Sequence, residues 1–230
     1  MKTRSLAPLA LALTTLFAAG SGMAQSTPTK TVDTSVDNVE VKDGKAQVSL
    51  SAGLYQGVLP GDKGFFLKEG EKAAGSEFTI DRIDETHSFA STVFSSSDDL
   101  RAKASIKTRL VTTRTCPRGG ARPELFDSKE VREGAQPAEG FAFAKVIASA
   151  RTDKTQISFT IDKGADDGVL PSSSGYALTA GPGRPLAQYV SISWVTAKTA
   201  GGTVNAGDAD QMLKNVKRIG YERLICKPMK

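Results

Sequence analysis

The sequence predicts an all-β protein with two tandem homologous modules, each a small β-barrel or sandwich, after an N-terminal signal peptide. Three observations lead to this prediction. An eleven-residue stretch occurs twice, as GVLPGDKGFFL from Gly57 and as GVLPSSSGYAL from Gly168. Runs of alternating apolar and polar residues recur between glycine-rich turns at intervals of ~8–12 residues, as in small barrels and sandwiches. Helical periodicity is nearly absent.

The N-terminus has the pattern of a secretory signal peptide. Lys2 and Arg4 form a charged region, Leu6–Ala19 is apolar, and Ala24 ends a group of small residues typical of a cleavage site. The apolar run of about 14 residues is shorter than the ~20 that a membrane-spanning helix needs. We therefore expect cleavage near Ala24, a mature chain without a transmembrane segment, and a periplasmic or secreted location.

The repeat extends well beyond the eleven residues. The alignment has an offset of 111 positions around the repeated stretch and drifts by one or two near the module ends. The aligned pairs include Gly53 with Gly164, Val48 with Phe159, Leu50 with Ile161, Arg109 with Arg218, and Cys116 with Cys226. A shared pattern over about 70 residues indicates two copies of one module.

Each copy is predicted to begin with a β-hairpin. In the first copy, Val36–Val41 and Ala46–Leu50 alternate on either side of Asp43-Gly44, a strong hairpin turn. In the second copy, Phe141–Ala150 and Gln156–Ile161 have the same relationship. The hairpin supplies two strands of each module.

Further strands are expected after the repeated stretch. They are, in chain order, Phe65–Leu67, Glu77–Ile83, His87–Phe94, Gln188–Val195 and Ala200–Val204. Each module thus has about six short strands, which is the size of a small barrel or sandwich. Ser97–Ala104 and Asp208–Val216 are the candidates for one short helix in each copy.

The repeated glycines and prolines are predicted to shape turns. They are Gly57, Pro60, Gly61 and Gly64 in the first copy, and Gly168, Pro171 and Gly175 in the second. Leu59-Pro60-Gly61-Asp62 suits a type II turn, because proline sets φ at the first corner and glycine accepts a positive φ at the second. Ser172 replaces this glycine in the second copy, which favours a type I turn there. The alternative, a phosphate-binding loop, would need a Gly-Lys-Ser/Thr signature and a helix start.

Changes in composition divide the chain into segments. We expect a signal peptide over residues 1–24, a disordered lead-in over 25–34, the first β-module over 35–118, a linker over 119–140 and the second β-module over 141–230. The linker is rich in Gly, Pro, Ala and charge, and the lead-in is polar and close to the new terminus, where chains are often poorly ordered.

The turn chemistry resembles that of small repeated β-modules in bacterial cell-envelope proteins, whose Gly-Val-x-x-Gly-x-x-Gly turn links two strands. Gly57-Val58, Gly61 and Gly64 match this pattern in full, and the second copy matches at Gly168-Val169 and Gly175. The resemblance covers both modules. It implies a β fold and an envelope location, and it carries over no catalytic residue.

No catalytic or metal-binding motif stands out. His87 is the one histidine of the chain, and it lies near a predicted strand edge. The chain has no His-Glu-x-x-His motif for zinc and no Gly-x-Ser-x-Gly elbow. A Ser–Lys pair would need no histidine, but no recognisable motif marks one. Asp208 and Asp210 are too few for a calcium loop. We therefore predict a protein that is not an enzyme and has no metal or cofactor.

Two cysteines in an exported chain predict a disulfide bond. Cys116 and Cys226 end the two modules at matching positions, so a bond between them would join the modules. The alternatives are two free thiols or a bond to another chain.

Basic residues gather at the matching ends of the modules. Arg101–Arg122 holds seven basic residues and no acid, and Gln211–Lys230 holds six basic residues and one acid. The candidate binding residues are Arg109, Arg114, Arg118, Arg122, Lys217, Arg218 and Arg223. A disulfide would bring both segments together as one cationic surface, which attracts anionic polymers. The alternative is a set of solvated strand faces.

These features predict a non-catalytic exported envelope or matrix protein that binds an anionic polymer, namely a polysaccharide, peptidoglycan or lipopolysaccharide. The first alternative is a protein-interaction or assembly subunit of a cell-envelope complex, and the second is an enzyme of unrecognised type. Nucleic acid is not an expected partner, because the chain is exported and aromatic residues are not interleaved with the basic ones. The sequence does not specify the oligomeric state.

Overall fold

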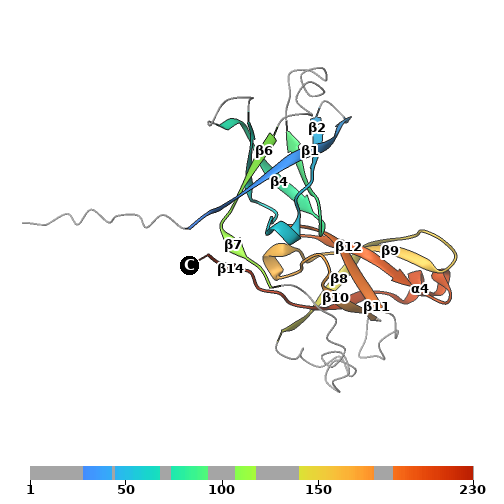
Figure 1. Cartoon of the computed structure of the whole chain (residues 1–230). Helices are drawn as coiled ribbons and strands as arrows, with labels where there is room; N and C mark the ends of the chain where they lie inside the picture. The colour runs from blue at the N-terminus through green and yellow to red at the C-terminus, as the bar shows by residue number, and fades with distance from the viewer. Residues whose placement is uncertain are drawn as a thin grey trace, which may run out of the picture.

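The computed structural model describes residues 28–42, 45–67, 74–92, 107–117, 140–178 and 189–229. Two lobes of β-structure lie against each other in these ranges (Figure 1). One lobe, blue to green, contains the strands up to residue 112, and the other, yellow to red, contains the strands from residue 141 onward. The all-β prediction is therefore confirmed.

Strands of the second lobe close into a six-stranded antiparallel barrel. They are β8 (Phe141–Arg151), β9 (Gln156–Ile161), β10 (Ser174–Leu178), β11 (Tyr189–Thr196), β12 (Ala200–Asn205) and β13 (Arg218–Glu222). The order around the ring is β8-β9-β12-β11-β10-β13, and β13 pairs with β8 to close it. We call this the C-terminal barrel.

Strands of the first lobe pair in an equivalent closed cycle. They are β1 (Lys30–Lys42), β2 (Lys45–Leu50), β3 (Lys63–Leu67), β4 (Ala74–Ile83), β5 (Ser88–Thr92) and β6 (Lys107–Thr112). The order is β1-β2-β5-β4-β3-β6, with β6 returning to β1. We call this the N-terminal barrel. When β1 to β6 are matched in chain order with β8 to β13, the two barrels have the same pairing order.

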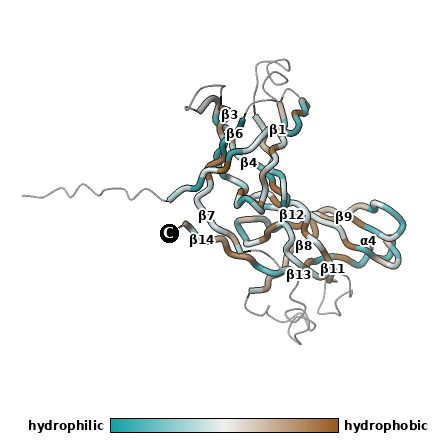
Figure 2. The backbone as a smooth tube through the Cα atoms, in the orientation of Figure 1, coloured by the Kyte–Doolittle hydropathy of each residue, from teal (hydrophilic) through white to brown (hydrophobic). Residues whose placement is uncertain are grey.

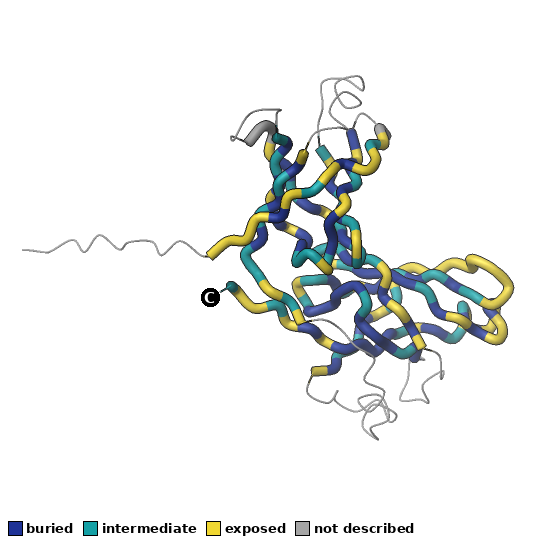
Figure 3. Tube along the Cα trace, in the orientation of Figure 1, coloured by how far each residue is buried: buried dark blue, intermediate teal, exposed yellow. Residues whose placement is uncertain are grey.

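Alternation of side chains decides which residues fill the barrel interiors. In β9, Ile157, Phe159 and Ile161 are buried and the polar residues between them are partly exposed. Val48 and Leu50 are buried in the same way in β2. Successive side chains of a strand point to opposite faces, so one face packs inward. Figure 2 shows hydrophobic and hydrophilic residues alternating along both lobes, and Figure 3 shows the exposed tip of the β8–β9 hairpin.

The expected helix of the second module is present as α4 (Ala209–Asn215). Asp208 caps it, because its carboxylate accepts hydrogen bonds from the backbone N–H groups of Asp210 and Gln211. The expected signal peptide, the linker as far as residue 139 and the candidate helix Ser97–Ala104 lie outside the described residues.

The predicted lead-in is wrong for residues 30–34, which form the first part of β1. Lys30–Ser35 pairs with β6, and Val32 is buried between these strands and the core. The strand pairing satisfies the backbone groups of this polar segment, which its own composition did not indicate. The expected boundary of the first module therefore moves toward the N-terminus.

A single hydrophobic cluster runs through both barrels. It includes Val58 and Leu59 of the first repeated stretch and Val169 and Leu170 of the second, all of which are at most 1% exposed. β4 pairs with β11 across the junction, where Ile83 lies opposite Val195. The core and this short strand pairing therefore join the barrels.

A two-stranded ribbon forms the second connection between the barrels. β7 (Arg114–Thr115) leaves the N-terminal barrel and pairs with β14 (Lys227–Pro228), which ends the C-terminal one. Cys116 and Cys226 form a disulfide beside this ribbon, as predicted. We call β7, β14 and the disulfide the disulfide ribbon.

None of the helices in the described part of the chain has the length and apolar character needed to cross a membrane.

Replacing both cysteines, as Cys116→Ser with Cys226→Ser, should lower the free energy of unfolding. The bond closes a loop between residues 110 positions apart. Loop entropy alone predicts a loss of about 4–5 kcal/mol in the chain-entropy model. Urea unfolding with and without a reductant measures this loss. Reductant should destabilise the native chain and leave the double variant unchanged, and an equal effect on both would contradict the prediction.

Candidate functional site

The two repeated stretches make the same turn in both barrels. Each follows one turn of 3₁₀ helix, η1 (Leu54–Gln56) or η2 (Ala165–Asp167). Gly57 and Gly168 end these helices with φ of 88° and 84°, in the left-handed region that glycine accepts without a steric cost. A positive φ at both positions agrees with the prediction that these two glycines shape turns.

The second corner of the turn differs between the copies. Gly61 and Ser172 occupy it with φ of 89° and 66°. The backbone N–H of Gly61 donates to Ile80 at 2.8 Å, and that of Ser172 donates to Ile192 at 2.9 Å. A type I turn has negative φ at both corners, so the expectation of a type I turn at Ser172 is wrong. The bond to the neighbouring strand holds serine in a conformation that normally favours glycine.

The residue after that corner also differs. Asp62, which is 5% exposed, accepts a hydrogen bond from the backbone N–H of Leu59 at 2.8 Å. The hydroxyl of Ser173 accepts the equivalent bond from Leu170 at 3.1 Å. Burial raises the pKa of Asp62 to about 6, although the Leu59 bond and the charge of Arg114 oppose the shift.

Glu85 connects the two barrels at this point. It lies in the β4–β5 turn and accepts a hydrogen bond from the Tyr55 hydroxyl at 2.7 Å. Its other carboxylate oxygen accepts a hydrogen bond from the hydroxyl of Ser172. Both oxygens of this acid are therefore engaged, and Ser172 is held by its backbone and by its side chain.

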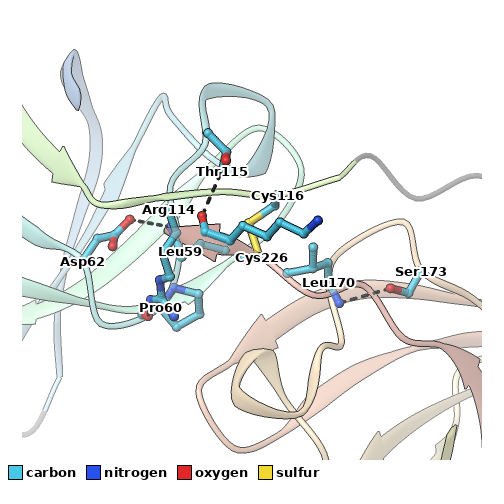
Figure 4. The surroundings of a disulfide bond; sticks show 10 residues. Leu59, Pro60, Asp62, Arg114, Thr115, Cys116, Leu170, Ser173 and Cys226 are labelled. Carbon is cyan, nitrogen blue, oxygen red and sulfur yellow. Dashed lines mark hydrogen bonds between the residues drawn. A yellow bond between two sulfur atoms is a disulfide. The ribbon is translucent and has the colours of Figure 1, made fainter. Parts of the chain in front are cut away.

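The disulfide ribbon passes between the two turns. Figure 4 shows Leu59, Pro60 and Asp62 on one side of the disulfide, and Leu170 and Ser173 on the other. Within the ribbon, Thr115 lies opposite Lys227 and Arg114 lies opposite Pro228. Arg114 is half-buried and donates a hydrogen bond from Nη2 to the carbonyl of Pro60 at 3.4 Å.

A pocket of about 470 Å³ opens where the ribbon meets both turns. We call it the junction pocket. Its walls come from both barrels and include Lys30, Tyr55, Gln56, Thr112, Arg114 and Ser172. The described lining contains two cationic side chains and no carboxylate. Such a lining favours a ligand with negative charge.

Thr112 contributes an unusual group to the junction pocket. Its side chain is buried, and its hydroxyl oxygen has no hydrogen-bond partner among the described residues. A buried hydroxyl without a partner is costly, typically by about 1–3 kcal/mol. The hydroxyl oxygen is itself shielded from solvent, so a ligand in the pocket does not reach it.

The structure separates the predicted basic residues. Arg114 lines the junction pocket, and Arg223 donates from Nε to the carbonyl of Asp167 at 3.2 Å. Arg109 forms a two-point ion pair with Asp33, at 2.7 and 3.3 Å. The hydrogen bond from Arg109 lowers the pKa of Asp33 and raises that of the arginine.

The remaining predicted residues lie elsewhere. Arg218 lies over the ring of Phe143, 5.4 Å from its centroid. Lys217 is exposed, and its backbone bonds to Val146 and Leu178. Arg118 and Arg122 fall outside the described residues.

Sequence reasoning missed several residues of the junction pocket. Lys30 was assigned to the lead-in, and it reaches the pocket because it pairs with Thr112 in the β1–β6 ladder. Tyr55 has no charge or motif to mark it. Lys227, which does not line the pocket, belongs to the basic segment Gln211–Lys230, and its strand pairing with Thr115 places it on the ribbon.

His87 lies at the end of the β4–β5 turn. Its ring is near Thr86 and Asp84 of this turn and near Asp37 of β1, with Nδ1 2.9 Å from the Thr86 hydroxyl. Within the described ranges, no three His, Cys, Asp or Glu side chains are grouped in a way that would hold a metal ion.

Comparison of the chain with protein-family models, with curated proteins and with solved structures found no match. Inferences about function therefore depend on the site itself.

Replacing Asp62 with serine, the residue of the second copy, should remove a pH dependence of stability. The ordinary pKa of an aspartate in the unfolded chain is 3.8 and the folded value is about 6, so the folded state holds a proton that the unfolded state has lost between these values. The contribution of Asp62 to stability is therefore greatest below about pH 4 and falls as the pH rises to about 6.

Urea unfolding of the native chain and of Asp62→Ser at about pH 4, 5, 6 and 7 tests this sign. The variant should gain stability relative to the native chain as the pH rises from about 4 to 6, with no further change above that range. A constant difference across the series would show that Asp62 has an ordinary pKa.

Substitutions of Ser172 should separate backbone strain from its bond to Glu85. Ser172→Ala and Ser172→Gly both lose the hydroxyl, but only alanine keeps a side chain at positive φ. The alanine variant should therefore be less stable than the glycine variant by about 1 kcal/mol. Thermal unfolding of the two variants measures the difference, and equal midpoints would show that the backbone at this corner relaxes.

Proposed function

We propose that this protein is a non-catalytic, exported protein that binds an anionic polymer of the cell envelope. The observation that carries the proposal is the cationic surface at the disulfide ribbon. Arg114 and Lys227 lie on the two paired strands of the ribbon, Lys30 lines the junction pocket with Arg114, and Arg223 is exposed shortly before Cys226. Within the described part of the chain none of these four cations forms an ion pair. Cations grouped in this way attract a polyanion over several ångströms.

The acids near the ribbon are already engaged. Asp62 accepts the Leu59 N–H, and Glu85 bonds to both Tyr55 and Ser172. Further out, Asp166 pairs with Lys198 at 2.8 Å. Because the donors to Asp62 and Glu85 are neutral, these bonds fix the two carboxyl groups without cancelling a charge, and the charge of Asp62 still acts on Arg114. Lys227 and Arg223, which are exposed, therefore contribute most directly to attraction of an external anion.

Two features support an envelope location. The sequence begins with the pattern of a signal peptide, and the chain has a disulfide bond, which persists in oxidising compartments. The likeness of the repeated turn to those of envelope β-modules points the same way. The location proposed is the periplasm or the outside of the cell.

The two barrels are proposed to be copies of one ancestral module. Their strand orders correspond one to one, and the turns make equivalent backbone bonds at Gly61 and Ser172. Duplication explains why the two basic ends carry cysteines at matching positions. The disulfide then combines the two ends into one surface.

Charge removal on the ribbon tests the proposal. The protein from Gln25 onward would be co-sedimented with insoluble envelope polymers at about 20 mM and about 500 mM salt. Native protein should pellet at low salt and be released at high salt. The triple variant Arg114→Gln, Arg223→Gln and Lys227→Gln should lose most of its binding at low salt, because each exposed cation contributes to polyanion attraction.

A second triple variant provides a control with the same change in net charge. Lys145, Lys154 and Lys214 are exposed on β8, on the β8–β9 turn and on α4 of the C-terminal barrel, and none of these elements belongs to the ribbon. Their replacement by glutamine should leave binding nearly unchanged. An equal loss in both variants would mean that only net charge matters. Binding that resists high salt would instead favour the assembly-subunit alternative, in which an apolar protein surface docks.

A further inference from the structure

Building on the polymer-binding function proposed above, we infer that the junction pocket binds a carboxylate-bearing sugar residue of an acidic polysaccharide. The polymer would lie along the disulfide ribbon, and one acidic sugar would enter the pocket between the barrels. Four features of the lining support this class of ligand: its size, its two cations, its glutamine amide and its tyrosine.

The size of the pocket suits a short saccharide segment. Its volume of about 470 Å³ lies within the ~300–1,000 Å³ typical of small-molecule sites. η1 and β6 of the N-terminal barrel, the ribbon, and Ser172 of the C-terminal barrel all contribute to the wall. The disulfide and the Glu85–Ser172 bond hold these parts together, so the site is formed before the ligand arrives.

The two cations match one carboxylate. Arg114 uses Nη2 to bond to Pro60, and a guanidinium has further N–H donors that can form a two-point bond to a carboxylate. Lys30 supplies a second, flexible charge from β1. Asp62 lies close enough to Arg114 for their charges to interact, which reduces the positive charge of the site. This reduced net positive charge favours a singly charged carboxylate over a doubly charged phosphate.

The side-chain amide of Gln56 suits an oxygen of the sugar. Its carbonyl oxygen accepts a hydrogen bond from the Gly53 N–H at 2.9 Å. The amide NH₂ group then remains as a donor for a hydroxyl or carboxylate oxygen of the ligand.

Tyr55 offers a surface for the sugar ring. Tyr55 is 52% exposed, and its hydroxyl donates a hydrogen bond to Glu85. Leu54 and Met229 make other parts of the lining apolar. An aromatic ring with its polar end anchored presents a rigid apolar face, which packs against the C–H face of a pyranose. A free phosphate or a simple inorganic anion would leave this face unused.

Isothermal titration calorimetry on the protein from Gln25 onward tests the inference with three probes. These are a tetramer of galacturonic acid, a neutral tetramer of galactose and inorganic phosphate. The acidic tetramer should bind, and the other two should bind at least about tenfold more weakly, because each lacks one of the matched groups. Equal binding of phosphate would overturn the sugar assignment, and equal binding of the neutral tetramer would overturn the role of the carboxylate.

Arg114→Gln and Tyr55→Ala should each weaken tetramer binding by about tenfold or more. Arg223→Gln is the matched control: Arg223 is an exposed arginine of the C-terminal barrel and does not line the junction pocket. It should weaken pelleting with the polymer and leave tetramer binding unchanged.

The outcomes separate the two proposals. If the polymer pellets in a salt-sensitive manner but the acidic tetramer does not bind, the cationic surface stands and the pocket inference fails. If the tetramer binds with the expected variant pattern, both stand. If neither binds, the polymer-binding function itself fails.

Discussion

The bond between Cys116 and Cys226 holds together the ribbon in which the ends of the two barrels meet. Each strand ring is closed by its own backbone hydrogen bonds, so neither barrel leaves a long edge for the other to pair with. In the described residues the short β4–β11 pairing, the shared core and the Glu85–Ser172 bond join the barrels as well. The covalent bond keeps the ribbon against both turns, and the junction pocket exists because of that placement.

The two repeated turns differ in sequence at the junction between the barrels. At the second corner of the turn, Gly61 in one copy corresponds to Ser172 in the other, and Asp62 corresponds to Ser173. Ser172 uses its hydroxyl to reach Glu85 of the other barrel, which glycine could not do. The two similar turns therefore have different roles: the first closes its barrel and lies against Arg114, and the second also joins the barrels. The asymmetry produces one junction pocket with walls from unlike elements.

Strand alternation made much of the fold predictable. Short-range patterns marked the β8–β9 hairpin and β4, because one buried face imposes a period of two on the sequence. The same patterns failed for the first part of β1, where Val32 is the main apolar residue and pairing with β6 provides the rest of the stabilisation. The patterns also did not predict β6 and β13 as strands, because threonine and arginine in β6, and arginine and glycine in β13, interrupt the apolar residues.

The sequence by itself determined the β class and the repeated stretches, because these depend on local alternation and self-similarity, and it left the partner of each cysteine open. The folded chain decided that Cys116 and Cys226 pair with each other. The tertiary structure decided which basic residues work together. Arg109 is held by Asp33, whereas Arg114 lines a pocket with Lys30. Charge counts along a chain do not show which cations have a nearby acid. Only strand pairing and closure bring residues from distant positions to one site.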